Sequence, residues 1–184
     1  MKLQSGISAI DFETQDIHGN KIKLSDFIGK KVILTFMRNV NCPFCNVRVN
    51  RLIGHSVRLQ KSGVQMILFF ESEKERLLKS VLHQGIAPFP IISDTHLKIY
   101  KQYGVESSVV KMLKTFVKSD IRKTMQEAKT LNVSAEKEKG VTNSLVPADF
   151  FINEQFKIVK AHYGKNIDDH VDLEELKKFA GLTY

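Results

Sequence analysis

The chain has 184 residues, of which 42% are hydrophobic and 26% charged, and its formal net charge is +8. This length suits one well-buried domain, and no apolar run approaches the roughly 20 residues that cross a bilayer, which argues against a membrane partner. The lysines and arginines are scattered and usually share a helix with glutamate, so the positive charge indicates a solvated surface rather than a nucleic-acid partner.

The N-terminal third predicts a hairpin followed by a buried strand. Residues 1–6 lack the apolar core of a signal peptide, which favours a cytoplasmic location. Residues 10–24 alternate polar and apolar side chains around the turn signal His18-Gly19-Asn20, which indicates a β-hairpin. Ser25-Asp26 could cap a short helical turn that ends at Gly29, and residues 32–37 then read as a buried strand rich in β-branched residues.

Both cysteines of the chain, Cys42 and Cys45, lie where the next helix is expected to begin. Pro43 suits a first helical turn, and apolar residues at helical spacing continue to the stop signal at Ser62-Gly63, with Gly54 as a candidate kink. The partial positive charge at a helix start stabilises a thiolate and lowers the pKa of a cysteine, which is about 8.5 in a free chain. The pair is therefore a candidate dithiol/disulfide centre, and a reducing cytosol favours a cycling disulfide over a permanent one.

Two other interpretations of the cysteine pair remain open. A Cys-x-x-Cys can be half of a zinc site, but the sequence offers neither a second such pair nor two histidines at ligand spacing. The cysteines could also be inert small hydrophobes of the core. The strand before the pair and the helix after it favour the reactive interpretation.

The middle of the chain alternates strands and helices. Residues 64–70 form a near-continuous apolar run, typical of a parallel strand covered on both faces, and a helix from Ser72 to Gly85 follows. A short strand over 89–94 and a helix over 95–103, stopped by Gly104, come next.

Residues 105–145 read as an insertion with one or two helices and a mobile loop at 134–140. The insertion carries a basic amphipathic segment whose apolar positions suit a helix packed on the domain edge better than one on a membrane surface; these positions are Val109, Val110, Leu113, Phe116, Val117, Ile121 and Met125.

The last third predicts a second hairpin, with strands at 147–152 and 156–163, and an amphipathic helix over 168–180. The two strands have no crossover between them and must be antiparallel. The chain as a whole is therefore expected to be a single α/β domain with a mixed central sheet flanked by helices.

At several points the sequence resembles the thioredoxin-fold superfamily and, within it, the peroxiredoxin-like (AhpC/TSA) proteins. The resemblance covers nearly the whole chain apart from the insertion. It depends on the order and spacing of several short motifs, namely Asp11-Phe12, Asp16…Gly19…Lys23-Leu24-Ser25-Asp26-Phe27, Val32-Ile33-Leu34-Thr35-Phe36, Cys42-Pro43-Phe44-Cys45, Asp149-Phe150-Phe151-Ile152-Asn153, Ile158-Val159 and Tyr163-Gly164.

The resemblance implies a thiol peroxidase in which one cysteine attacks a peroxide and the other forms a disulfide with it. The peroxiredoxin register makes Cys45 the attacking residue, whereas the thioredoxin register makes Cys42 the exposed nucleophile, which we favour. The arginine that peroxiredoxins hold before the strand at 149–153 is missing from residues 143–147, and Arg38 is the nearest substitute.

Three further residues are candidates for contact with substrate. Asn39 and Asn41 offer amide donors beside the cysteines, although asparagine in such a joint can simply shape the turn. Pro147 directly precedes a strand, as does the cis-proline that faces the cysteines of thioredoxin-like oxidoreductases; the resemblance suggests a cis bond there, and the sequence leaves it open.

No metal, nucleotide or flavin is implied, because the sequence has no G-x-G-x-x-G and no phosphate loop. The expected partners are a peroxide and a thioredoxin-like or small-thiol reductant, and a homodimer is compatible with the resemblance. Two other functions stay open: a thioredoxin-type thiol-disulfide oxidoreductase that ignores peroxide, and a non-enzymatic interaction module with both cysteines in its core.

Overall fold

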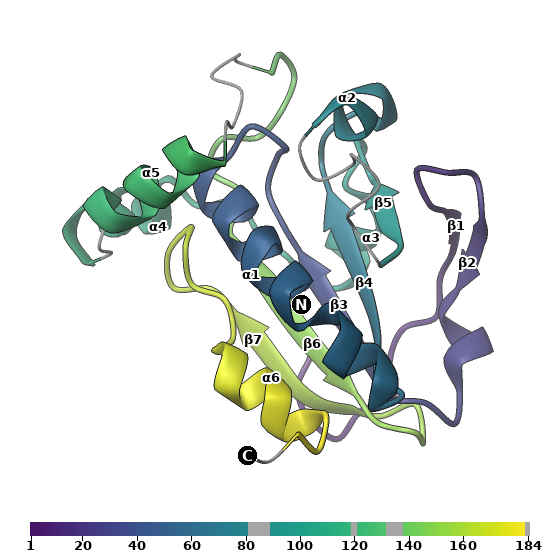
Figure 1. The fold of residues 1–184 in the computed structure, drawn as a ribbon. Helices are drawn as coiled ribbons and strands as arrows, with labels where there is room; N and C mark the ends of the chain where they lie inside the picture. Colours follow the sequence, from purple (N-terminus) through teal and green to yellow (C-terminus); the bar gives the residue numbers. More distant parts are fainter. Residues whose placement is uncertain (81–88, 119–120, 132–137, 183–184) are drawn as a thin grey trace.

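The computed structural model describes residues 1–80, 89–118, 121–131 and 138–182, and these form a central sheet with helices on both faces (Figure 1). The sheet has the strand order β5-β4-β3-β6-β7. Its members are β3 (Val32–Phe36), β4 (Gln65–Phe70), β5 (Ile91–Ser93), β6 (Ala148–Ile152) and β7 (Ile158–Tyr163). Strands β3, β4 and β5 are parallel, whereas β6 is antiparallel to both β3 and β7. The expected mixed sheet is therefore confirmed.

Helices cover the sheet on both sides, and this explains why its central strands are apolar throughout. The long helix α1 (Pro43–Lys61) and the C-terminal helix α6 (Leu173–Phe179) pack on one face, while α3 (Lys98–Gln102) packs on the other. Every residue of β3 is buried. Ile33 belongs to the core under α1, and Leu34 to the opposite core, as the period of two in a strand requires.

Both expected hairpins are confirmed. The first pairs β1 (Glu13–Gln15) with β2 (Lys21–Lys23) and leads into the short 3-10 helix η1 (Leu24–Phe27). Its turn is held by the Asp16 carboxylate, which accepts hydrogen bonds from the N–H groups of His18 at 2.9 Å and Asn20 at 2.8 Å. The second hairpin is β6–β7.

Three helices are shorter than the sequence pattern indicated. Helix α2 (Lys74–Lys79) ends before the expected stop at Gly85, which lies outside the described residues. Helix α3 begins at Lys98 because the Asp94 carboxylate accepts the N–H of that residue and so shapes a turn before it. Helix α6 begins only after Asp172, whose side chain accepts the Glu174 N–H and caps the helix.

The insertion contains two helices, α4 (Val109–Lys118) and α5 (Ile121–Thr130). Helix α5 packs against α1, where Arg51 and Glu127 form an ion pair at 2.6 Å. The expectation that the apolar positions of the insertion pack inward is wrong for the first turns of α4, where Val109, Val110 and Leu113 are exposed. It is also wrong for Met125 of α5, which is exposed as well. The side chains of residues 116–117 and most of the loop at 134–140 lie outside the described residues.

Candidate active site

The cysteine pair lies where β3 turns into α1, at the carboxyl end of the parallel strands. The parallel ladder continues past β3, since the Met37 N–H donates to the Phe69 carbonyl at 2.9 Å and the Glu71 N–H to the Arg38 carbonyl at 3.1 Å. The chain then folds into a joint over residues 39–41. Ligands of open α/β sheets bind at this end of the strands, so the topology puts the thiols at a position suited to chemistry.

Side-chain hydrogen bonds hold the joint and the helix start in place. The Val40 N–H donates to the Ser72 hydroxyl at 2.8 Å, which ties the joint to the end of β4. From the second turn of α1, the buried Asn46 amide donates to the carbonyls of Val40 at 2.6 Å and Cys42 at 2.9 Å. Pro43 occupies the first turn, and Cys42 is the residue that immediately precedes α1.

Arg38 contacts both sulfur atoms. A terminal guanidinium nitrogen donates to Cys42 Sγ at 3.1 Å, and the Arg38 backbone N–H donates to Cys45 Sγ at 3.4 Å. The other terminal nitrogen donates to the Asn143 carbonyl. The guanidinium is thus fixed between the first thiol and residues 143–147, the segment where the sequence resemblance calls for an arginine.

The two thiols have opposite pKa shifts. A hydrogen bond from the Cys45 thiol, together with the Arg38 charge and the first N–H groups of α1, outweighs burial and lowers the pKa of Cys42 to about 6. Burial raises the pKa of Cys45 well above its ordinary value, and the hydrogen bond that the Cys45 thiol donates to Cys42 raises it further. At neutral pH the arrangement therefore pairs a Cys42 thiolate with a protonated Cys45.

The expectation that Cys42 is exposed is wrong, because Cys42 is only 4% exposed and Cys45 only 2%. Both cysteines belong to the apolar core beneath α1. Burial alone does not make the pair inert, since the sulfur of Cys42 is held beside a guanidinium and a helix start. Both of these features favour the thiolate.

One segment of the insertion, Glu138–Asn143, crosses the joint and is called the strap below. At one end, the Glu138 carboxylate accepts from the Ser72 hydroxyl at 2.6 Å and is itself buried. At the other end, the Thr142 N–H donates to the buried Glu71 carboxylate at 2.6 Å, and Asn143 accepts from Arg38. The strap therefore holds the guanidinium against Cys42.

The predicted substrate-contacting residues have different positions in the structure. Asn39 is buried, and its carbonyl accepts from the Cys42 N–H at 3.1 Å, so its backbone shapes the joint. Asn41 is half-buried directly before Cys42. Pro147 is buried immediately before β6, and the suggested cis bond is wrong because its peptide bond is trans.

Sequence reasoning did not single out the polar residues that support this site, although they carry a recognisable signal. Glu71 and Asn46 are buried polar side chains inside otherwise apolar stretches, and such residues require partners. The same is true of Asp149 on β6, whose carboxylate accepts from His170 at 3.0 Å and from the Val171 N–H at 2.8 Å. Burial opposes its ionisation, but His170 and Arg48 hold the pKa of Asp149 far below its usual range.

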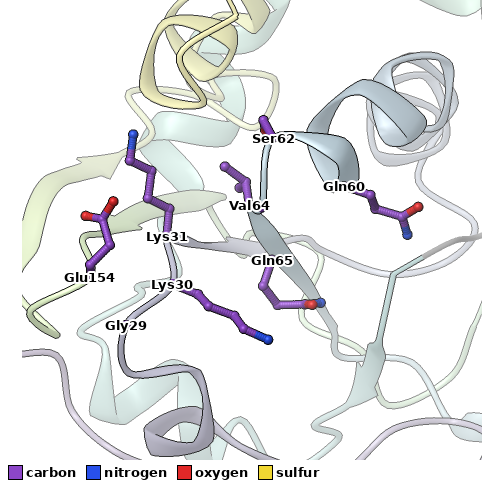
Figure 2. Close-up of a pocket in the computed structure, with 9 residues that line it drawn as sticks. Gly29, Lys30, Lys31, Gln60, Ser62, Val64, Gln65 and Glu154 are labelled. Carbon is purple, nitrogen blue, oxygen red and sulfur yellow. The ribbon is translucent and has the colours of Figure 1, made fainter.

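The described surface also has a hollow of about 490 Å³ at the other end of α1 (Figure 2). It is lined by Lys30 and Lys31 before β3, by Gln60 and Ser62 at the end of α1, and by Glu154 from the β6–β7 turn. It lies at the amino ends of the parallel strands, away from both cysteines. Among the described residues, no three histidine, cysteine, aspartate or glutamate side chains are arranged to hold a metal ion.

Comparison with known proteins identifies the family of this chain. A sequence model described as the AhpC/TSA family matches residues 6–161. The chain belongs to the AhpC/TSA family. Within the described residues of this AhpC/TSA protein, none of the helices is long and apolar enough to span a membrane.

Curated relatives of this AhpC/TSA chain include two kinds of thiol enzyme. Peroxiredoxin Bcp of Escherichia coli is 28% identical over 114 residues, which is 62% of this chain and 72% of that protein. The thiol-disulfide oxidoreductase ResA of Bacillus thuringiensis is 31% identical over 104 residues, which is 56% of this chain and 60% of that protein. The chain is therefore an oxidoreductase whose relatives include both a peroxiredoxin and thiol-disulfide oxidoreductases.

Solved structures support the thioredoxin fold. A putative thiol:disulfide interchange protein DsbE from Chlorobium tepidum matches with a TM-score of 0.65 and 20% identity, over 97% of this chain and 99% of that one. Peroxidoxin BcpB from Mycobacterium tuberculosis matches with a TM-score of 0.64 and 15% identity, over 99% of both chains. At these identities the likeness concerns the fold alone.

Proposed function

We propose that this protein is a thiol peroxidase that reduces hydrogen peroxide or organic hydroperoxides through Cys42 and Cys45. The observation that carries the proposal is the contact between Cys42 and Arg38, whose guanidinium donates to Cys42 Sγ at 3.1 Å; the hydrogen bond from Cys45 and this charge lower the pKa of Cys42 to about 6. The similarity to Peroxiredoxin Bcp supports the peroxide substrate. Arg38 would take the part of the arginine missing from residues 143–147.

The proposed cycle assigns a different role to each thiol. The Cys42 thiolate attacks one peroxide oxygen, the O–O bond breaks, and the other oxygen leaves with a proton as water or an alcohol. Cys42 is then a sulfenic acid. The Cys45 sulfur attacks it, a disulfide forms, and hydroxide leaves with the Cys45 proton as water. A dithiol reductant returns the pair to its starting state by exchange.

The raised pKa of Cys45 suits the order of the two steps, because this thiol stays protonated and unreactive while the Cys42 thiolate attacks the peroxide. Burial of Cys42 beside the Arg38 guanidinium also favours a small oxidant over a protein disulfide. Hydrogen peroxide needs only a narrow approach to the sulfur, whereas a protein disulfide needs a wider opening around it.

The proposal is tested by mass spectrometry of Cys42→Ser and Cys45→Ser after brief exposure to peroxide. We expect Cys45→Ser to accumulate a sulfenic acid on Cys42, and Cys42→Ser to stay unmodified. The reverse pattern would make Cys45 the attacking residue. Loss of peroxide on mixing with the reduced wild-type protein measures the whole cycle, with dithiothreitol as the reductant.

A second candidate function is thiol-disulfide oxidoreductase, which the similarity to ResA favours. A low-pKa cysteine directly before a helix also suits attack on a disulfide. Reduction of insulin disulfides separates the two candidates. Rapid insulin reduction by a reduced protein that leaves peroxide untouched would replace the peroxidase proposal with this one.

A further inference from the structure

Two buried polar atoms near the thiol pair have no hydrogen-bond partner within the described part of the chain. They are Oε2 of Glu71 and Nε of Arg38. Both residues are more than nine-tenths buried, since Glu71 is 4% exposed and Arg38 7%. An unpaired buried donor or acceptor destabilises a fold, so such atoms in a native protein require an explanation. A substrate site supplies one, because it keeps polar atoms free for the molecule that it binds.

Three contacts hold Glu71 and Arg38 next to each other. The two residues lie just after the adjacent parallel strands β4 and β3, and the Glu71 N–H donates to the Arg38 carbonyl at 3.1 Å. Glu71 Oε1 accepts the Thr142 N–H at 2.6 Å, and Arg38 Nη2 donates to the Asn143 carbonyl. Thr142 and Asn143 are consecutive, so their Cα atoms are about 3.8 Å apart. The carboxylate and the guanidinium therefore meet the strap at the same place.

Both groups also lie close to the sulfur atoms. Arg38 Nη1 donates to Cys42 Sγ at 3.1 Å, and the free Nε belongs to the same planar guanidinium. Burial raises the pKa of Tyr100 well above its ordinary value, and the charges that Cys45 and Glu71 carry when ionised raise it further. The Tyr100 hydroxyl is thus within electrostatic reach of the second thiol and of the carboxylate alike.

A hydroperoxide complements this pair of free atoms. As a carboxylate, Glu71 can only accept hydrogen bonds, whereas the Arg38 guanidinium can only donate them. A hydroperoxide has an O–H donor and two acceptor oxygens, so one small molecule can contact both groups at once. The pair would therefore distinguish the two ends of the O–O bond, with one O–H directed to Glu71 and the other oxygen directed to Arg38.

We propose that Glu71 is a catalytic residue, whose free carboxylate oxygen binds the O–H of the hydroperoxide while Arg38 Nε binds the other oxygen. The inference rests on the proposed function, in which the Cys42 thiolate attacks a peroxide.

The bound geometry fixes which oxygen is attacked. The Cys42 sulfur attacks the oxygen whose O–H is held by Glu71, an S–O bond forms, and the O–O bond breaks. The other oxygen leaves with the electron pair of that bond, and the positive charge of Arg38 stabilises it. It takes up a proton from solvent and departs as water or an alcohol. Cys42 is oxidised to a sulfenic acid, which keeps the O–H proton, and the peroxide is reduced.

Glu71→Gln tests this role without removing the contact with the strap. The glutamine oxygen can accept the Thr142 N–H, which puts the NH2 group where Oε2 lies and replaces an acceptor by a donor. Glu75→Gln, at an exposed glutamate of α2, is the matched control for the loss of one negative charge. The second-order rate constants of Cys42 are measured at pH 8 with hydrogen peroxide and with iodoacetamide, which has no O–H. Mass spectrometry identifies the modified residue.

We expect the rate constant for hydrogen peroxide to fall at least about tenfold in Glu71→Gln, because a hydrogen bond to a charged group is lost. The rate constant for iodoacetamide should stay within about twofold, since pH 8 lies well above the Cys42 pKa of about 6 and the loss of a nearby negative charge favours the thiolate. Both rate constants should be unchanged in Glu75→Gln.

A second variant, Glu71→Asp, decides the question if circular dichroism shows that Glu71→Gln does not fold. It keeps the charge, but its shorter side chain draws the carboxylate away from the peroxide while it holds Thr142. We expect a slower reaction with peroxide and an unchanged reaction with iodoacetamide in this variant too.

The other outcomes overturn one of two statements. An unchanged or faster reaction of Glu71→Gln with peroxide would mean that the carboxylate does not bind the substrate. An equal fall with both reagents would mean that Glu71 acts only by holding the strap, and each of these results would overturn the catalytic role and leave the peroxidase intact. A wild type that iodoacetamide alkylates at Cys42 but that leaves peroxide untouched would overturn the peroxidase itself.

Discussion

Replacing Arg38 by methionine should raise the pKa of Cys42 and slow its reactions at neutral pH. The guanidinium lies 3.1 Å from Cys42 Sγ, and two unit charges at that distance attract by about 5 kcal/mol at an effective dielectric constant of about 20. This figure is a ceiling, because solvent and neighbouring dipoles compensate for a lost charge. Opposite charges in such contacts shift a pKa by about 1 to 3 units.

A shift of about 2 units would move the pKa of Cys42 from about 6 to about 8. At pH 7 the thiolate fraction would fall from roughly nine-tenths to roughly one-tenth, since each pKa unit changes the ratio of the two forms tenfold. The alkylation rate of Cys42 at pH 7 should therefore fall about tenfold. Above pH 9 the rates of the two proteins should converge.

The measurement is the rate of iodoacetamide alkylation against pH, with the modified residue identified by mass spectrometry. Arg38→Lys keeps a charge but loses the simultaneous contact with Cys42 and Asn143. The midpoint of its alkylation profile should therefore lie between those of the wild type and Arg38→Met. Arg58→Met, at an exposed arginine near the end of α1, is the control and should behave as the wild type. A midpoint that stays near 6 in Arg38→Met would refute the assignment of the low pKa to the guanidinium.

Three further predictions concern the thiol partner, the buried acid and a tight turn. Cys45→Ala should raise the midpoint of the Cys42 alkylation profile by about one pH unit, because the hydrogen bond from Cys45 is the largest cause of the low pKa of Cys42. Cys45→Ser keeps a hydrogen-bond donor and should raise the midpoint less. Equal midpoints in the Cys45→Ala variant and the wild type would contradict this cause. Asp149→Asn should lower the free energy of unfolding by about 3 kcal/mol in urea titrations, since the variant leaves Arg48 and His170 without a buried counter-charge. Because folding lowers the pKa of Asp149, its contribution is complete above the ordinary aspartate value of about 4 and is lost as the pH falls below it, so the wild type should lose more stability than Asp149→Asn between pH 5 and pH 3. Gly164→Ala should lower the melting temperature, because a Cβ there would lie 2.9 to 3.0 Å from three backbone oxygens, and an unchanged melting temperature would mean that this turn can relax.

Much of the fold could be predicted from local patterns. The apolar runs at 32–37 and 64–70 became central strands, because a strand covered on both faces has no polar side. The position of Pro43 marked the start of α1 correctly. Helix boundaries were less predictable where a single carboxylate sets the start, as Asp94 and Asp172 do.

The interpretation of the insertion failed where periodicity was the only guide. The spacing of Val109, Val110 and Leu113 correctly indicates one helical face, but the same pattern fits a face turned to the core and a face turned to solvent. Only the tertiary structure shows that α4 is held by Met112 and Thr115 instead. Hydrophobic periodicity defines a stripe, and the neighbouring elements decide what covers it.

The sequence by itself determined the thioredoxin-like order of elements and the position of both cysteines at the start of a helix, because these depend on residues adjacent in the chain. The tertiary structure decided that Arg38 faces Cys42, that the strap holds this guanidinium, and that the pKa values of the two thiols shift in opposite directions. These properties arise from contacts between residues up to 105 positions apart, such as Arg38 with Asn143. A pKa depends on which charges and donors surround a group in space, and spacing along the chain does not contain that information.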